Sequence, residues 1–176
     1  MKALNNKLTG KSYKDSILII ALYAILFDIA LLIILGIAYN TTGGFFENTD
    51  SPIVRILLGD EMKKSGLIVD LIGGGLIAPF VETVLFHIPF IAILRKLPVD
   101  REFIIVLTTV TFSSIHVVNG LIALVLTLPG SFFIAYTYLR YIDMNFKKAV
   151  FGAMLVHGLA NVVLICIGYT YDYLIQ

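Results

Sequence analysis

The sequence predicts an all-α fold: a polytopic membrane bundle of about five transmembrane helices plus a short interfacial helix. One observation is composition, because 59% of the 176 residues are hydrophobic and only 14% are charged. Soluble domains have about 45–50% apolar and about 25% charged residues. The other observation is the length of the apolar runs, because a helix needs about 20 residues to cross a bilayer. These features exclude a disordered chain, a nucleic-acid-binding protein and an ordinary cytosolic enzyme.

The first expected span covers residues 16–39 and contains a single charged residue, Asp28. A polar stretch follows at residues 40–66. Within it, residues 51–58 begin with Ser-Pro and continue with apolar side chains around Arg55. This pattern is typical of a short amphipathic helix that lies on the membrane surface.

The second expected span, residues 67–94, carries Asp70 and Glu82 and is too long for one upright helix. The three consecutive glycines Gly73–Gly75 allow this length to be accommodated in two ways. They either break the segment, leaving its first part along the interface, or allow a tilted helix. They are expected to permit close helix contact or a bend, and not to bind a ligand.

The third and fourth spans lie within residues 103–139, which contain no Asp, Glu, Lys or Arg. A single helix of this length would reach roughly 55 Å, so the segment must fold back. Asn119-Gly120 is the expected turn, because both residues tolerate positive φ, and it divides the segment into spans 103–118 and 121–139. The fifth span is the uncharged run 149–171.

The Lys and Arg residues predict the orientation of the bundle. Ten of the 13 basic residues lie in three places: before the first span, between the second and third spans, and between the fourth and fifth spans. The other three lie in the stretch 40–66. Cytoplasmic loops are enriched in such residues, so the N-terminus is expected in the cytoplasm and the tyrosines at 169–173 at the outer interface. The N-terminal segment is expected to be a retained anchor. No linker is visible, so residues 1–176 are expected to form a single membrane domain.

Several ionisable side chains remain inside the expected spans, namely Asp28, Glu82, His87, His116 and His157. A charged side chain at mid-membrane costs at least about 2.5–3.5 kcal/mol, so such residues usually mark functional sites. A purely structural role, hydrogen bonding between helices, is the alternative for any one of them. Measured from the cytoplasmic ends of their helices, Glu82, His116 and His157 lie about 18, 21 and 13 Å deep. These depths are compatible with one shared site.

The spacing within the helices adds partners to this group. His157 and Asn161 are four residues apart and share a helix face, as do Phe112 and His116. One reading makes Glu82 a general base toward water, with a histidine orienting that water and His157 and Asn161 stabilising an oxyanion. The other makes Glu82, His116 and His157 a zinc site, although no H-E-x-x-H motif is present. Sensitivity to a chelator would separate the two.

Three motifs in order resemble the CPBP intramembrane proteases, the CAAX protease and bacteriocin-processing or Abi family, which includes type II CAAX prenyl endopeptidases. The family's first motif, Glu-Glu-x-x-x-Arg after Ala-Pro, resembles Ala78–His87. Its second, Phe-x-x-x-His, resembles Phe112–His116, and its third, His-x-x-x-Asn, resembles His157–Asn161. The resemblance covers residues 70–168, the expected catalytic core.

The resemblance implies an intramembrane endopeptidase in which Glu82 and His116 activate water and His157 and Asn161 form the oxyanion site. It implies no cofactor, with zinc as the alternative. The partners it implies are the lipid bilayer and a membrane-associated peptide or lipidated protein as substrate. The small size of the chain resembles the bacterial members, which are linked to peptide maturation and bacteriocin self-immunity, so the expected location is a bacterial cell membrane.

The first motif departs from the family pattern at two positions, where Thr83 replaces the second Glu and His87 replaces the Arg. A Thr83–His87 hydrogen bond is one way to replace the lost ion pair. Asp28 has no counterpart in the motifs, and we expect it to pair with His87. Two alternatives to the protease remain open: a non-catalytic immunity or binding protein on the same fold, and a proton-coupled transporter, although no internal repeat supports the latter.

Overall fold

The computed structural model describes residues 1–41, 66–119 and 121–175, and these residues form helices joined by short turns, with no strand among them. In chain order the helices are α1 (Lys2–Leu8), α2 (Tyr13–Thr41), α4 (Leu67–Ile72), η1 (Gly73–Ile77), α5 (Ala78–Glu82), η2 (Thr83–His87), α6 (Ile88–Leu94), α7 (Arg101–Ile115), η3 (His116–Asn119), α8 (Leu121–Ile142) and α9 (Phe146–Ile175).

Five helical stretches are long and apolar enough to span a membrane, which confirms the predicted fold class. They are Tyr13–Ile37, Leu67–Leu94, Arg101–Val118, Ala123–Ile142 and Phe146–Thr170. Helices suit this environment because every backbone polar group finds its partner within the segment. The predicted interfacial helix at 51–58 lies outside the described residues.

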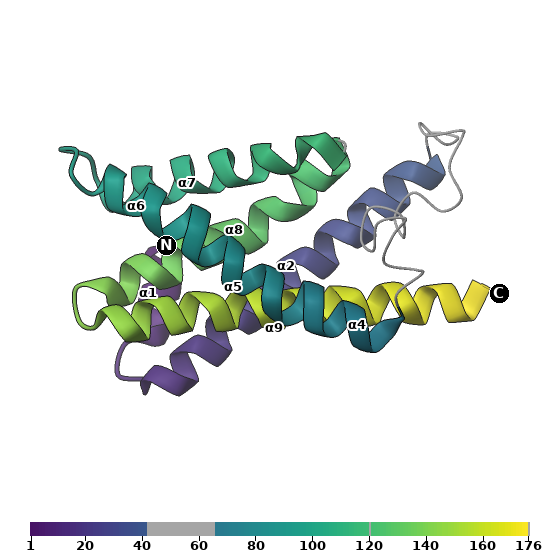
Figure 1. Cartoon of the computed structure of the whole chain (residues 1–176), viewed down its shortest axis with the longest axis horizontal. Helices are drawn as coiled ribbons and strands as arrows, with labels where there is room; N and C mark the ends of the chain where they lie inside the picture. The colour runs from purple at the N-terminus through teal and green to yellow at the C-terminus, as the bar shows by residue number, and fades with distance from the viewer. Residues whose placement is uncertain (42–65, 120, 176) are drawn as a thin grey trace.

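Helix α8 is the most buried of the spans and packs against α7, α9 and α2 (Figure 1). The stretch from α4 to α6 crosses α9 obliquely. The three glycines do not break it, because the chain stays helical from Leu67 to Leu94. At 1.5 Å per residue such a stretch is about 42 Å long, so it fits a bilayer only when tilted.

Two turns of this second span are π-helical: η1, over Gly73–Ile77, and η2, over Thr83–His87. Each is followed within two residues by a proline, Pro79 or Pro89. A proline removes one backbone donor and collides with the carbonyl four residues earlier, and the wider π turn relieves both problems locally. Isolated π turns are frequent at functional sites, and Glu82 lies between these two.

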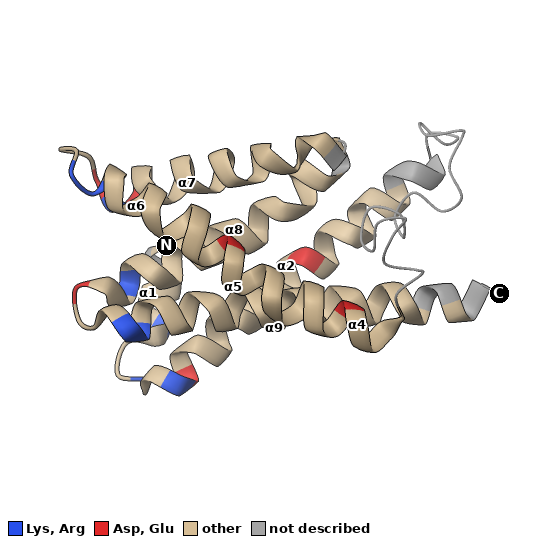
Figure 2. Ribbon diagram, viewed as in Figure 1, with Lys and Arg blue, Asp and Glu red and all other residues tan. Residues whose placement is uncertain are grey.

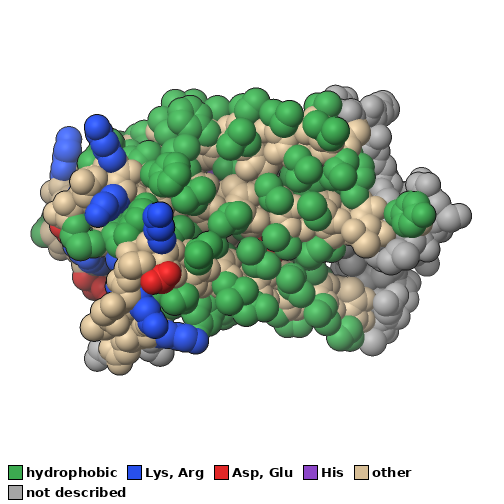
Figure 3. All heavy atoms as spheres, turned by 90° about the horizontal axis from the view of Figure 1, so that it is seen from below, with side chains coloured by type: hydrophobic (Ala, Val, Ile, Leu, Met, Phe, Trp, Pro, Cys, Tyr) green, Lys and Arg blue, Asp and Glu red, His purple; other side chains and the backbone are tan. Residues whose placement is uncertain are grey.

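The described basic residues all lie at one end of the bundle, and hydrophobic side chains cover its middle (Figures 2 and 3). At this end the Asp143 carboxylate joins two turns, with Arg95 Nη2 at 2.5 Å and a second ion pair to Arg101. Asp100 caps α7 by accepting a hydrogen bond from the backbone N–H of Phe103 at 2.6 Å. The part of the chain that the structure describes therefore has an apolar belt and a positively charged rim.

The hydrophobic core occupies the half of the bundle next to the basic rim. Its members come from the first half of α2, from α6 and α7, from the second half of α8 and from the first half of α9, with Leu8 of α1 packed beneath them. Farther along the same helices the interior becomes polar, and this is where the ionisable side chains gather.

Asp70 is separate from that polar interior. Its carboxylate accepts a hydrogen bond from the hydroxyl of Tyr169, which joins α4 to α9. The expected aromatic belt therefore includes a tyrosine with a specific polar partner, and Asp70, although buried, has a structural explanation.

Candidate functional site

A cavity of about 190 Å³ lies between five parts of the chain, α2, α5, the α7–η3 junction, α8 and α9. That volume accommodates several water molecules. Its lining residues are Asp28, Glu82, Phe112, His116, Ala123, Leu126, Thr127, Gly130, Ser131, Ile134, His157, Ala160, Asn161, Leu164 and Ile165. Glu82, His116, His157 and Asn161, which the sequence places on three separate spans, therefore share one cavity.

Glu82 is the last residue of α5, and its carboxylate lies next to the imidazole of His157 on α9. Glu82 Oε2 lies 3.5 Å from His157 Nε2. The Glu82 side chain keeps 30% of its surface exposed, whereas His157 keeps 8%. The carboxylate can therefore contact water in the cavity while the imidazole behind it is held in the protein.

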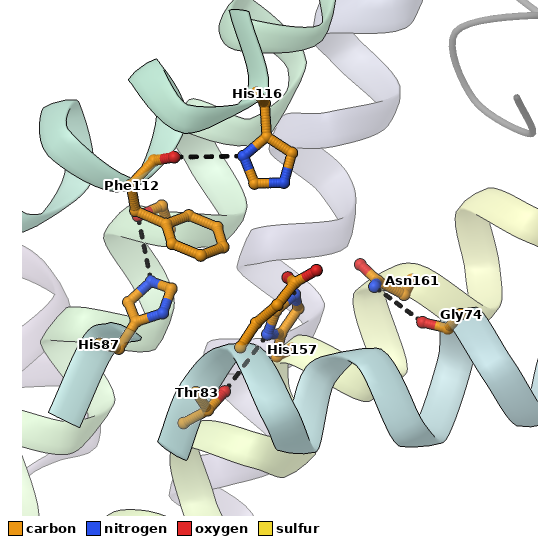
Figure 4. A network of polar contacts seen from close by, with 9 residues as sticks. Gly74, Thr83, His87, Phe112, His116, His157 and Asn161 are labelled. Atoms are coloured by element: carbon orange, nitrogen blue, oxygen red, sulfur yellow. Dashed lines mark hydrogen bonds and ion pairs between the residues drawn. The ribbon is translucent and has the colours of Figure 1, made fainter. Parts of the chain in front are cut away.

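The other ring nitrogen of His157 contacts Thr83. The Thr83 Oγ1 to His157 Nδ1 distance is 3.3 Å, and Thr83 is completely buried (Figure 4). Since an ionised carboxylate can only accept hydrogen bonds, a neutral His157 that faces Glu82 carries its proton on Nε2. Its Nδ1 is then the acceptor and the Thr83 hydroxyl the donor, which places Thr83, His157 and Glu82 in one polar chain.

His116 enters the cavity from η3, directly after α7. Its Nδ1 lies 3.1 Å from the carbonyl oxygen of Phe112 (Figure 4). A carbonyl cannot donate, so this nitrogen carries the proton, and in the neutral ring the lone pair is on Nε2. His116 is therefore arranged to accept a hydrogen bond from a molecule in the cavity that it lines.

The Phe112 ring lies among all three histidines. The ring centroids are 4.0 Å apart for His87, 4.8 Å for His116 and 6.2 Å for His157. Such tilted and edge contacts are favourable aromatic arrangements. The Phe-x-x-x-His spacing thus supplies both the packing centre of the site and the carbonyl that orients His116.

Asn161 lies one helical turn after His157 on α9. Its Nδ2 donates to the carbonyl oxygen of Gly74 in η1 at 2.9 Å (Figure 4). The side-chain amide has two N–H groups, so one remains for a ligand in the cavity. The bond also fixes the direction of the amide, because it ties the side chain to the neighbouring helix.

Close contact between η1 and α9 makes this bond possible. A Cβ atom added to Gly158 would lie 2.9 Å from the Gly75 carbonyl oxygen, and one added to Gly75 would lie 2.7 Å from Val162 Cγ2. Both distances are too short for a real side chain. The expectation of close helix approach is therefore confirmed at Gly75, and the approach serves the site directly.

Two expected contacts of His87 are wrong. Its Nε2 lies 3.3 Å from Ser131 Oγ on α8, so the predicted Thr83–His87 bond is absent, and Thr83 contacts His157 instead. No hydrogen bond or ion pair joins His87 to Asp28, although the structure describes both. The physical reason is that His87 contacts Ser131 and the Phe112 ring and lines a second, smaller pocket, whereas Asp28 lines the main cavity.

Sequence reasoning missed the contribution of α8. Thr127, Gly130 and Ser131 line the cavity, and Ser131 also holds His87. These residues surround Pro129, the proline inside an otherwise regular helix. A proline flanked by small and polar residues in an uncharged span was the signal available for them.

The alternative reading of Glu82, His116 and His157 is a zinc site, and it stays a prediction. Among the residues that the structure describes, no three His, Cys, Asp or Glu side chains come close enough together to hold one ion. Glu82, His116 and His157 line a cavity that accommodates water.

A family model for Rce1-like type II CAAX prenyl endopeptidases matches residues 64–163, more than half of the chain. The chain belongs to the Rce1-like family. No curated protein and no solved structure matches it. The match to the Rce1-like family includes Glu82, His116, His157 and Asn161 and excludes Asp28. Family membership confirms the predicted resemblance and supports a membrane-embedded enzyme of the protease class.

Within this Rce1-like site, Thr83→Val is expected to lower the rate of peptide cleavage by roughly 10-fold to 100-fold. The change removes the donor that the described residues supply to His157 Nδ1. It leaves a buried acceptor without that partner, at a cost of about 1–3 kcal/mol. Thr83→Ser keeps the hydroxyl and should retain most of the rate. The measurement is kcat and KM of both purified variants in vesicles. Equal rates for the two variants would show that the hydroxyl has no role.

Proposed function

We propose that this protein is an intramembrane endopeptidase that hydrolyses a peptide bond in a membrane-associated peptide or lipidated protein, with a water activated by Glu82. The observation that carries the proposal is the 3.5 Å approach of Glu82 Oε2 and His157 Nε2 at the wall of a cavity that accommodates water. A carboxylate in a low-dielectric site, held by one imidazole and facing another, has the environment of a general base.

In the proposed reaction a water lies between Glu82 and the Nε2 lone pair of His116. His116 orients the water, and Glu82 takes its proton as the oxygen attacks the substrate carbonyl. The remaining N–H of Asn161 donates to the developing oxyanion. Once Glu82 is protonated, the Nε2–H of His157 becomes free to donate to the same oxygen. Glu82 then gives its proton to the leaving amine, which restores the carboxylate.

The substrate class follows from the position of the cavity. It lies within the apolar belt, beyond the hydrophobic core as measured from the basic rim. A substrate must therefore reach it from the membrane, which favours an apolar or lipidated peptide. By the positive-inside rule we propose that the basic rim and the N-terminus are cytoplasmic. A bacterial cell membrane is the proposed location.

The non-catalytic immunity or binding protein is the competing proposal, because the first motif lacks its second Glu and its Arg. The Thr83 contact argues for the enzyme. Thr83 provides His157 with a partner that keeps the imidazole directed toward Glu82. The lost charges therefore do not leave the remaining carboxylate and imidazole without orientation.

The experiment uses the purified chain in phosphatidylcholine vesicles with an internally quenched peptide that carries an S-farnesyl cysteine three residues from its C-terminus. We expect cleavage by the wild type and a loss of about 10²-fold or more with His116→Ala or His157→Ala, with both variants still folded by circular dichroism. Cleavage is expected to persist in a zinc chelator. The immunity protein would be favoured by two results together. The wild type would not cleave prenylated peptides, and its protection of cells would be unchanged by these substitutions.

A further inference from the structure

The first transmembrane helix contributes one acidic side chain to the cavity, and neither the motifs nor the proposed chemistry uses it. Asp28 lies near the middle of α2 and lines the same cavity as Glu82, His116 and Asn161. It is 3% exposed, and its Oδ1 atom has no hydrogen-bond partner among the described residues. A buried polar atom without a partner is costly, so its position calls for an explanation.

The charges around the cavity are of one sign. Two carboxylates, Asp28 and Glu82, belong to the lining, and none of the described residues that line it is Lys or Arg. Glu82 has His157 at 3.5 Å, whereas the described residues give Asp28 no ion-pair partner and leave its Oδ1 atom without a hydrogen bond. In a low-dielectric cavity such a carboxylate favours N–H donors, and most of all a cationic group, which forms a charge-assisted hydrogen bond.

We propose that Asp28 is a specificity-determining residue that binds a positively charged group of the substrate, a Lys or Arg side chain or a free amino terminus near the bond to be cleaved. This inference rests on the proposed function and adds to it a substrate class: apolar peptides with one cationic group. The same carboxylate disfavours acidic peptides, since a further negative charge in the cavity has no counter-ion among the described lining residues. Asp28 acts from α2, outside the stretch that matches the family.

The test uses a series of quenched farnesylated peptides in which Lys, Met or Glu occupies each position near the cleaved bond in turn. For the wild type we expect kcat/KM for the best Lys peptide to exceed that of its Met counterpart by about 10-fold or more, with Glu lowest. Asp28→Asn should reduce the Lys-to-Met ratio to within about twofold, and Asp28→Glu, which keeps the charge, should retain it.

Asp70→Asn is the matched control, because Asp70 is also a buried intramembrane aspartate but hydrogen-bonds Tyr169 and does not line the cavity. It should leave the Lys-to-Met ratio unchanged. Stability provides a second readout: the melting temperature should rise in Asp28→Asn, because an unpartnered buried carboxylate is removed. An aspartate with a structural role would show the opposite, a fall in melting temperature with an unchanged ratio, and this result would overturn the inference.

Binding separates this inference from the proposed function. Dye-labelled Lys, Met and Glu peptides are titrated against the Glu82→Gln protein and followed by fluorescence anisotropy, with and without Asp28→Asn. Preference for Lys that depends on Asp28, together with no cleavage by the wild type, would contradict the peptidase and support the cation site. Cleavage of all three peptides with equal kcat/KM, unaffected by Asp28→Asn, would support the peptidase and contradict the cation site.

Discussion

Replacing Glu82 by glutamine is expected to reduce peptide cleavage by about 10²-fold to 10⁴-fold, the contribution of a positioned general base. Glutamine has the same shape and can keep its oxygen toward His157, so the cavity should stay intact. It cannot accept a proton from water at neutral pH. The loss should therefore appear in kcat, with KM and the melting temperature close to the wild-type values, when both proteins are assayed in the same vesicles.

Glu102→Gln is the matched control for this substitution. Glu102 is exposed in the first turn of α7 at the basic rim and does not line the cavity. The same chemical change there should leave kcat and KM unchanged. Full cleavage by the Glu82→Gln protein would contradict the mechanism, and loss of cleavage in both variants would indicate a general effect of acidic side chains and not a catalytic carboxylate.

Replacing Gly158 by alanine is expected to destabilise the protein by roughly 1–3 kcal/mol, the usual cost of overpacking, despite the better helix propensity of alanine. The new Cβ would lie 2.9 Å from the Gly75 carbonyl oxygen. That oxygen is backbone and cannot move by a change of rotamer, so η1 and α9 must separate. Separation would lengthen the Asn161–Gly74 bond and draw His157 away from Glu82. We expect a lower melting temperature by circular dichroism and a strong loss of cleavage.

Gly73→Ala tests whether this effect is specific. Gly73 belongs to the same run of glycines and the same π turn as Gly75, but a Cβ added to Gly73 would meet nothing within 4 Å. It should leave stability unchanged or raise it by up to about 1 kcal/mol, because alanine loses less backbone entropy than glycine. Equal melting temperatures for Gly158→Ala and the wild type would show that the two helices are not in rigid contact.

Several parts of the site could be predicted from the sequence because they depend on spacing within one helix. The four-residue intervals from Phe112 to His116 and from His157 to Asn161 place each pair on one face whatever the tertiary structure. The depths of Glu82, His116 and His157 follow equally from the rise of a helix. Because few residues inside the spans are charged, the remaining ionisable residues could be identified as candidates for the site.

Contacts between helices could not be predicted in the same way, since they depend on rotation and crossing angle. Thr83 and His87 share a helix and suggested a bond to each other, yet each contacts a different neighbouring helix. Asp28 was expected to contact His87, but His87 contacts the Phe112 ring and Ser131 and does not line the cavity that Asp28 lines. Which side chains meet was decided by the packing of α8 and α9.

The sequence by itself determined the five spans, the basic rim and the short set of residues that carry chemistry, because hydrophobicity and charge act locally along the chain. Tertiary structure alone decided that Glu82 contacts His157, that Asn161 is tied to Gly74 and that Asp28 lines the same cavity with no hydrogen-bond partner for its Oδ1 atom among the described residues. The Asn161–Gly74 bond depends on the close approach of α9 to η1, which the absence of side chains at Gly75 and Gly158 permits. Like the other two relations, it joins residues far apart in the sequence.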